Sequence, residues 1–218
     1  MKPRNVACIL SLALLSLPAL ADEVNIADLP ASKPVDTKPR LAYGQVLRYG
    51  DKLMFAPCRD RSFVFFEDVS ADGQVGKALD LIGLAAGKKL YVELLGFVEH
   101  DRLKASQVNF AQTDGRCQVP GASDEAWRAS GNEPGWILAA GGERVQFKRQ
   151  GRPEVVLPYA SALPENGVAN YRVADGGHAL TLRFEQKLCH DRQANSVFGW
   201  AASVTLDGET LHGCAWQR

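Results

Sequence analysis

The sequence predicts a mainly β protein: an OB-like small barrel with one helix, followed by an all-antiparallel small β-barrel or sandwich. Short segments of alternating apolar and polar residues, separated by glycine-rich turns, indicate the strands. In the first half, three strands, a helix and two strands follow one another, which is the element order of an OB fold. Four of the five cysteines, two in each module, predict that each module is closed by a disulfide.

Residues 1–21 have the three parts of a secretory signal peptide. Lys2 and Arg4 give a positive start, residues 6–20 are apolar, and residues 19–21 read Ala-Leu-Ala, as a signal peptidase requires. The apolar run is too short for a permanent membrane span. We therefore expect cleavage before Asp22 and a soluble periplasmic protein.

The cysteine positions predict the disulfide pairing. Cys8 lies inside the apolar run, where it would be removed with the signal, and not at the cleavage site as in a lipoprotein. Of the three possible connectivities, the default in an oxidising compartment is sequential, Cys58 with Cys117 and Cys189 with Cys214. Closing these loops would stabilise the fold by about 4 and about 3.5 kcal/mol respectively.

Charge and composition restrict the partners. Without Lys2 and Arg4, the basic residues fall from 25 to 23 against 25 acidic ones, so nucleic acid is not an expected partner. Residues 22–42 contain Pro30, Pro34 and Pro39 and predict an extended Pro-rich linker.

The OB-like module is expected over residues 43–118. Val75, Leu79, Ile82 and Ala86 recur at helical spacing. The alternation of the third strand places Phe63 and Phe65 on one face, interpreted as core packing instead of a binding platform. The expected strands are 44–49, 52–56, 62–69, 89–99 and 105–113.

A linker at 119–126 separates this module from the second, residues 127–218. Apolar alternation in 180–184 and 198–206 gives each of these strands one buried face, and Asp207-Gly208 is a strong hairpin signal. The expected strands are 127–130, 136–140, 144–149, 155–159, 171–174, 179–186, 198–206 and 210–216.

Two segments of the second module carry a resemblance to a known family. Residues 131–136 read G-N-E-P-G-W, and Cys189-His190-Asp191 is followed by a closing Gly213-Cys214-Ala215. The chain resembles an uncharacterised family of exported bacterial envelope proteins and lipoproteins with G-N-E-P-F-W, C-x-D-x-M-S and G-C-A segments. Here Gly135 replaces the aromatic residue, and Gln193-Ala194 replaces Met-Ser. The resemblance implies a location and a fold, but no reaction.

The first module is similar to the OB-like C-terminal domain of the NlpE family of envelope-stress and copper-homeostasis lipoproteins. The similarity lies around residues 53–58 and 90–96. It too implies a location in the cell envelope.

The motif residues Asn132, Glu133, Pro134, Trp136 and Asp191 have two interpretations. In the first they form a structural corner: Asn132, Glu133 and Asp191 bond neighbouring backbone, and Trp136 lies in the core. In the alternative, Glu133 and Asp191 converge as the paired carboxylates of a glycoside hydrolase. The first interpretation is favoured. Trp200 is a further candidate, either as a structural residue of this module or as a binding residue.

His190 and His212 each lie near a disulfide cysteine, which makes them weak candidates for a metal site. Their spacing fits no standard zinc pattern, and a disulfide removes the thiolates. No cofactor is expected. Histidines at the surface beside a disulfide are the favoured interpretation.

These observations favour a non-catalytic periplasmic envelope protein that binds an unknown envelope partner or small ligand through barrel loops, with a place in envelope stress or homeostasis. A lysozyme-inhibitor-like protein is one alternative, because such inhibitors are small exported disulfide-bonded β-barrels. An envelope hydrolase that uses Glu133 and Asp191 is the alternative from another class.

Overall fold

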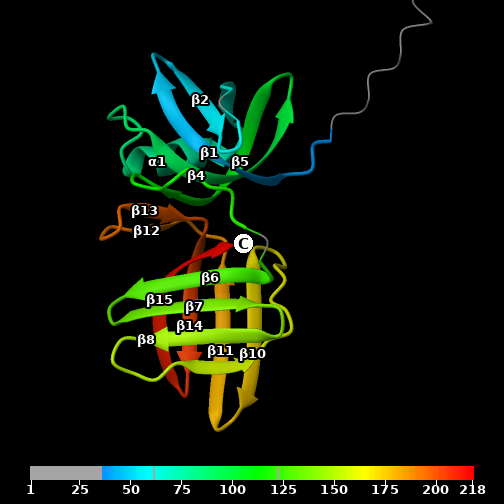
Figure 1. Ribbon diagram of the computed structural model, residues 1–218, viewed down its shortest axis with the longest axis vertical. Coiled ribbons are helices and arrows are strands. Elements are labelled where there is room, and N and C mark those ends of the chain that lie inside the picture. The colour runs from blue at the N-terminus through cyan, green and yellow to red at the C-terminus, as the bar shows by residue number, and fades with distance from the viewer. Residues whose placement is uncertain (1–35, 61, 122) are drawn as a thin grey trace, which may run out of the picture. The chain divides into compact units, whose positions relative to one another are not determined.

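The computed structural model describes residues 36–60, 62–121 and 123–218 (Figure 1). The predicted signal peptide, and the predicted linker as far as residue 35, lie outside these residues. The described chain is mainly β with one short α-helix, as the alternation predicted. Among the described residues, no helix has the length and apolar character needed to cross a membrane.

Five strands of the first half close into a barrel. Hydrogen bonds join them in the ring β1–β2–β3–β5–β4, and the β4–β5 and β1–β4 pairings complete the circle. Strand β3 runs parallel to β5, while the other neighbours are antiparallel. This ring, with a helix between β3 and β4, confirms the OB-like barrel. The strands are β1 (Arg40–Tyr49), β2 (Lys52–Pro57), β3 (Val64–Asp68), β4 (Leu90–Glu99) and β5 (Arg102–Gln112).

The helix of this barrel is α1 (Gln74–Leu81), preceded by a short 3-10 turn, η2 (Ala71–Gly73). Its apolar face packs into the core, as the spacing predicted. It ends earlier than the spacing to Ala86 suggested, because Gly83 has a φ of 115°, outside the helical region. Ile82 stays buried in the turn that follows.

The second half forms an eight-stranded antiparallel barrel that is nearly closed. Its hydrogen-bonded order is β10–β11–β14–β15–β6–β7–β8–β9. Across the gap between β9 and β10, the Tyr171 hydroxyl donates to the Pro158 carbonyl at 2.8 Å, and the Tyr159 and Tyr171 rings pack at 4.8 Å. The strands are β6 (Glu125–Asn132), β7 (Gly135–Gly141), β8 (Arg144–Arg149), β9 (Val155–Pro158), β10 (Val168–Asp175), β11 (His178–Glu185), β14 (Trp200–Leu206) and β15 (Glu209–Gln217).

A small hairpin between β11 and β14 joins the sheet of the first barrel. It consists of β12 (Cys189–Asp191) and β13 (Ser196–Phe198), and β13 pairs antiparallel with residues 110–112 of β5. The sequence predicted one strand over 198–206, but the chain passes from β13 to β14 at Gly199. A side chain there would collide with the Val108 carbonyl of β5, so this close approach requires glycine.

A buried polar network lies beside this hairpin. Asn109 of β5 bonds the backbone of Gln217 in β15 through both ends of its side-chain amide, each at 2.9 Å. It also donates to the Glu93 carboxylate at 3.1 Å, which accepts a second bond, at 3.0 Å, from the Tyr91 hydroxyl. Glu93 is only 3% exposed, and burial raises its carboxyl pKa even though the Arg218 guanidinium lies 3.9 Å away.

Both predicted disulfides are present. Cys58 is bonded to Cys117, and Cys189 is bonded to Cys214. The first lies within the chain segment of the OB-like barrel. The second ties β12 to β15, so it fixes the small hairpin to the second barrel.

Candidate functional site

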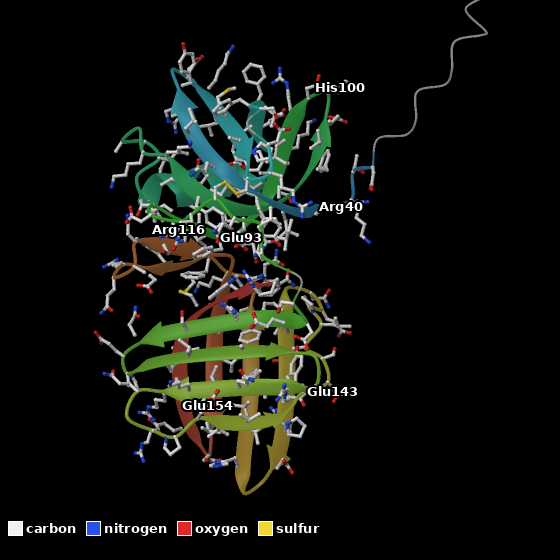
Figure 2. All side chains as sticks on the ribbon, viewed as in Figure 1. Arg40, Glu93, His100, Arg116, Glu143 and Glu154 are labelled. Atoms are coloured by element: carbon white, nitrogen blue, oxygen red, sulfur yellow. A yellow bond between two sulfur atoms is a disulfide. The ribbon has the colours of Figure 1, made fainter. Side chains whose placement is uncertain are left out.

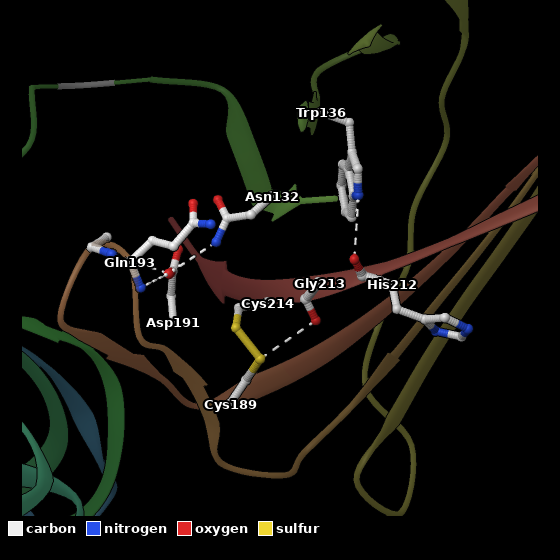
Figure 3. Close-up of a disulfide and its surroundings, with 9 residues drawn as sticks. Asn132, Trp136, Cys189, Asp191, Gln193, His212, Gly213 and Cys214 are labelled. Atoms are coloured by element: carbon white, nitrogen blue, oxygen red, sulfur yellow. Dashed lines mark hydrogen bonds between the residues drawn. A yellow bond between two sulfur atoms is a disulfide. The ribbon is translucent and has the colours of Figure 1, made fainter. Parts of the chain in front are cut away.

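Two of the motif residues, Asn132 and Asp191, meet at one corner beside the Cys189–Cys214 disulfide (Figure 3). One oxygen of Asp191 accepts hydrogen bonds from the Asn132 side-chain amide at 2.9 Å and from the backbone N–H groups of Gln193 and Ala194 at 2.9 and 3.1 Å. The carboxylate therefore closes its own turn and connects that turn to the end of β6.

The glycines of the motif make room for Trp136. A Cβ at Gly131 would collide with the Trp136 indole, and a Cβ at Gly213 would collide with both the indole and the Ser130 carbonyl. Trp136 is 3% exposed, as predicted, and its indole N–H donates to the His212 carbonyl at 3.3 Å (Figure 3). The Trp136 ring and the close approach of the β6 and β15 backbones together account for both glycines.

Glu133 does not join this corner. Its side chain is exposed, and within the described part of the chain it makes no hydrogen bond or ion pair, so the expected turn bonds of this carboxylate are not formed. The residue that meets Asp191 is the neighbouring Asn132. Pro134 follows through a cis peptide bond.

Trp200 is a core residue, 3% exposed, and its ring packs edge-on against Trp127 at 5.0 Å. Its indole N–H is buried and has no hydrogen-bond partner among the described residues. By contrast, the Trp127 indole donates to the Ala162 carbonyl at 2.9 Å.

The two histidines lie on different strands. His190 is in β12, opposite Val197, and His212 is in β15, where its Nδ1 lies 3.1 Å from the Ser203 hydroxyl. The described residues contain no group of three or more His, Cys, Asp and Glu side chains placed to hold a metal ion. The Cys189 and Cys214 sulfurs are used in the disulfide.

The outer face of the OB-like barrel carries exposed aromatic side chains, and here the expectation from the sequence is wrong. Phe63, which precedes β3, and Phe65 are 53% and 41% exposed, while Phe66 is buried. Three aromatics in four positions fit either phase of the alternation. The barrel uses Val64 and Phe66 for its core, so Phe65 points outward.

Two cations flank the exposed Phe65 ring. Lys52 Nζ lies 5.3 Å and Arg102 Cζ 5.6 Å from the ring centroid, within cation–π range. In the register, Phe65 is opposite Met54 of β2 and Arg102 of β5, so this patch spans three strands. We call Lys52, Met54, Phe65 and Arg102 the OB face.

The described acidic side chains near the OB face do not pair with its two cations, Lys52 and Arg102. Lys104, further along β5, is paired at 2.5 Å with Glu99, and this contact lowers the pKa of the Glu99 carboxyl and raises that of Lys104. Within the described residues, neither Lys52 nor Arg102 has an ion-pair partner. His100 lies at the tip of the β4–β5 hairpin (Figure 2), two residues before Arg102 in the sequence.

In comparisons with known proteins, no family model, curated protein or solved structure matches the chain. The site must therefore be judged on its own residues. The motif corner uses its polar groups for internal bonds, whereas the OB face presents an aromatic ring and two unpaired cations to the surface.

Proposed function

We propose that this chain is a non-catalytic periplasmic envelope protein that binds a partner or ligand in envelope stress or homeostasis, and that it does so through the OB face. The observation that carries the proposal is Phe65, exposed between Lys52 and Arg102. OB folds bind ligands on the face of strands 2 and 3 and through the β1–β2 and β4–β5 loops, which is where this patch lies.

The chemistry of the face suggests what it binds. An exposed ring offers an apolar surface, and the two cations attract negative charge. A partner that presents an apolar or aromatic group next to an anionic group fits both. Nucleic acid fits less well, because the acidic residues of the chain balance its basic ones.

The location rests on the sequence. Residues 1–21 have the pattern of a signal peptide, and both disulfides are of the kind that persist in an oxidising compartment. The resemblance of residues 131–136 and 213–215 to exported envelope proteins supports the same compartment.

Photo-cross-linking in cells tests this proposal. With p-benzoylphenylalanine at position 65, we expect one discrete adduct in the periplasmic fraction. The same amino acid at position 137, where Ile137 is 60% exposed on β7 of the second barrel, should give no such adduct.

The captured molecule is then titrated with the purified protein and two variants. Phe65→Ala and Arg102→Gln should each weaken binding about tenfold or more, because each removes one of the two recognition elements. An adduct of equal yield at positions 65 and 137, or unchanged binding by both variants, would refute the OB face as the binding site.

A further inference from the structure

A cavity lies in the eight-stranded barrel, apart from the OB face. It has a volume of about 360 Å³ and is lined by the β8–β9 loop, the β14–β15 turn and the first residue of β11. Its apolar wall includes Phe147 and Leu211 of the barrel core, together with the partly exposed Val155 and Leu206. Ligand pockets commonly have this size and such an apolar lining, and they often occur at the mouths of β-barrels.

An ion pair and a hydrogen-bonded pair involve four side chains at the rim of this cavity. Arg149 Nη1 lies 2.5 Å from Glu209, and His178 Nδ1 lies 2.7 Å from Asp207. The Arg149 hydrogen bond lowers the pKa of Glu209, and the backbone N–H of Ala179, followed by His178, lowers that of Asp207. These four side chains satisfy one another and fix the rim.

Two charges of opposite sign are left without direct partners. Arg152 and Glu154 flank Pro153 in the β8–β9 loop, and all three line the cavity. Among the described residues, neither the Arg152 guanidinium nor the Glu154 carboxylate makes a hydrogen bond or an ion pair. Arg152 lies near enough to Glu209 to help lower its carboxyl pKa, but not in contact with it. The cavity thus combines an apolar wall with one free cation and one free anion.

We propose that this cavity binds a small zwitterion with an apolar side chain, of the class of the apolar α-amino acids. The ligand carboxylate bonds Arg152, its ammonium group bonds Glu154, and its side chain rests on Val155 and Leu206. A ligand with only one charge forms an ion pair with only one of Arg152 and Glu154, and a purely apolar ligand forms an ion pair with neither. This proposal concerns a different barrel from the OB face and is independent of it.

The probes are L-leucine, L-methionine and L-phenylalanine, added to the purified protein and followed by the NMR shifts of its backbone amides. We expect saturable shifts for at least one of them, confined to residues 147–155, His178 and residues 206–211, the segments that line the cavity. Two analogues of leucine, 4-methylpentanoate without the amine and 3-methylbutylamine without the carboxylate, should bind about tenfold more weakly or worse, because each lacks one charge-assisted bond.

Two variants assign the charges. Arg152→Gln should abolish the preference for leucine over 3-methylbutylamine, and Glu154→Gln should abolish the preference for leucine over 4-methylpentanoate. Both positions are exposed, so the fold should persist, and the unchanged spectrum of the second barrel checks this. Arg172→Gln, an exposed cation of β10 away from the cavity, is the matched control and should bind like the wild type.

The absence of saturable shifts with all three amino acids overturns the proposal. Shifts located elsewhere, or equal binding of leucine and both analogues, also overturn it. Binding to the variants that matches the wild type would show that the two charges play no part, which contradicts the assigned recognition.

Discussion

The two barrels place their polar residues differently. In the second barrel, the residues that stand out in the sequence, the G-N-E-P-G-W segment and Asp191, bond or pack internally, apart from the exposed Glu133 and Pro134. In the OB-like barrel, the candidate binding residues Lys52, Phe65 and Arg102 belong to no motif, and they are notable only because the structure leaves them exposed. A recognisable motif can therefore mark a structural brace, and a binding surface can lack any motif.

The largest test of this contrast is Trp136→Ala. The substitution leaves a cavity where Gly131 and Gly213 had made room for the ring, and it should lower the free energy of unfolding by about 3–5 kcal/mol. Urea unfolding measures it. Ile137→Ala, at a 60% exposed position next to it, should change the stability by less than about 0.5 kcal/mol. Equal effects of the two variants would contradict a bracing role for the motif.

Asn109→Ala tests what connects the two barrels. It removes two bonds to Gln217 and one to Glu93 and leaves buried groups unpaired, so we expect a loss of about 2–4 kcal/mol. Tryptophan fluorescence reports mainly on the second barrel, whereas far-ultraviolet circular dichroism reports on the whole chain. In the variant, the unfolding transitions followed by these two signals should have different midpoints. Coincident transitions at an unchanged midpoint would show that the network does not couple the barrels.

Asp191→Asn should cost about 1–2 kcal/mol, because an amide oxygen is a weaker acceptor than a carboxylate for the three donors it meets. Glu133→Gln should leave the melting temperature nearly unchanged, since the Glu133 side chain bonds nothing in the described structure. If Asp191→Asn instead keeps the wild-type stability and abolishes a measured hydrolysis of envelope glycan, the enzyme interpretation gains support.

Glu93 should affect the pH dependence of stability in the opposite direction from surface carboxylates such as Glu99 and Glu209, whose pKa values are lowered. The pKa of Glu93 is raised in the folded protein, so the stability associated with its protonated form is present below the ordinary value of 4.5 and is lost as the pH rises through the folded pKa. Glu93→Gln removes this loss. The variant should therefore gain stability relative to the wild type between pH 4 and pH 8, as measured by urea unfolding across that range. A constant difference would contradict the raised pKa.

A small effect on stability is also expected for Phe65→Ala on the OB face. Phe65 is 41% exposed, so its truncation should cost less than about 1 kcal/mol, well below the cost at Trp136. The same variant should bind the captured molecule about tenfold more weakly or worse, as stated above. A loss of stability as large as that of Trp136→Ala would mean that Phe65 is a packing residue after all.

Much of the fold could be predicted because it follows from local patterns. Alternation, helical spacing and turn residues predicted the element order apart from the β12–β13 hairpin, and sequential cysteine pairing predicted both disulfides. The side of the sheet that Phe65 occupies could not be predicted, since neighbouring aromatics satisfy both phases of the strand. Tyr91 and Glu93 alternate with Val92 and Leu94, yet both pairs are buried. On the side of Tyr91 and Glu93, the Glu93 carboxylate contacts Asn109, which bonds Gln217 of β15, and lies near Arg218. No local pattern can reveal these contacts, because the residues lie far apart in the sequence.

The β12–β13 hairpin escaped prediction for a similar reason. Each of its strands is three residues long, too short to show a period, and its partner β5 lies far away in the sequence. At the motif corner, the pattern around Asp191 did predict a turn that bonds backbone N–H groups. The contact of Asp191 with Asn132 is a tertiary one and needed the structure.

The position of β13 also has a consequence for the order in which the protein is made. Strand β5 pairs with β3 only over residues 102–105, so the remainder of that edge waits for β13, which pairs with residues 110–112. When the chain emerges N-terminus first, residues 196–198 follow the end of β5 by more than eighty residues. Until then the OB-like barrel carries an open strand edge, the kind of surface that recruits other chains. We therefore expect the emerging chain to be most prone to aggregation after β5 has emerged and before β13 follows, and a chaperone would protect it most at that stage.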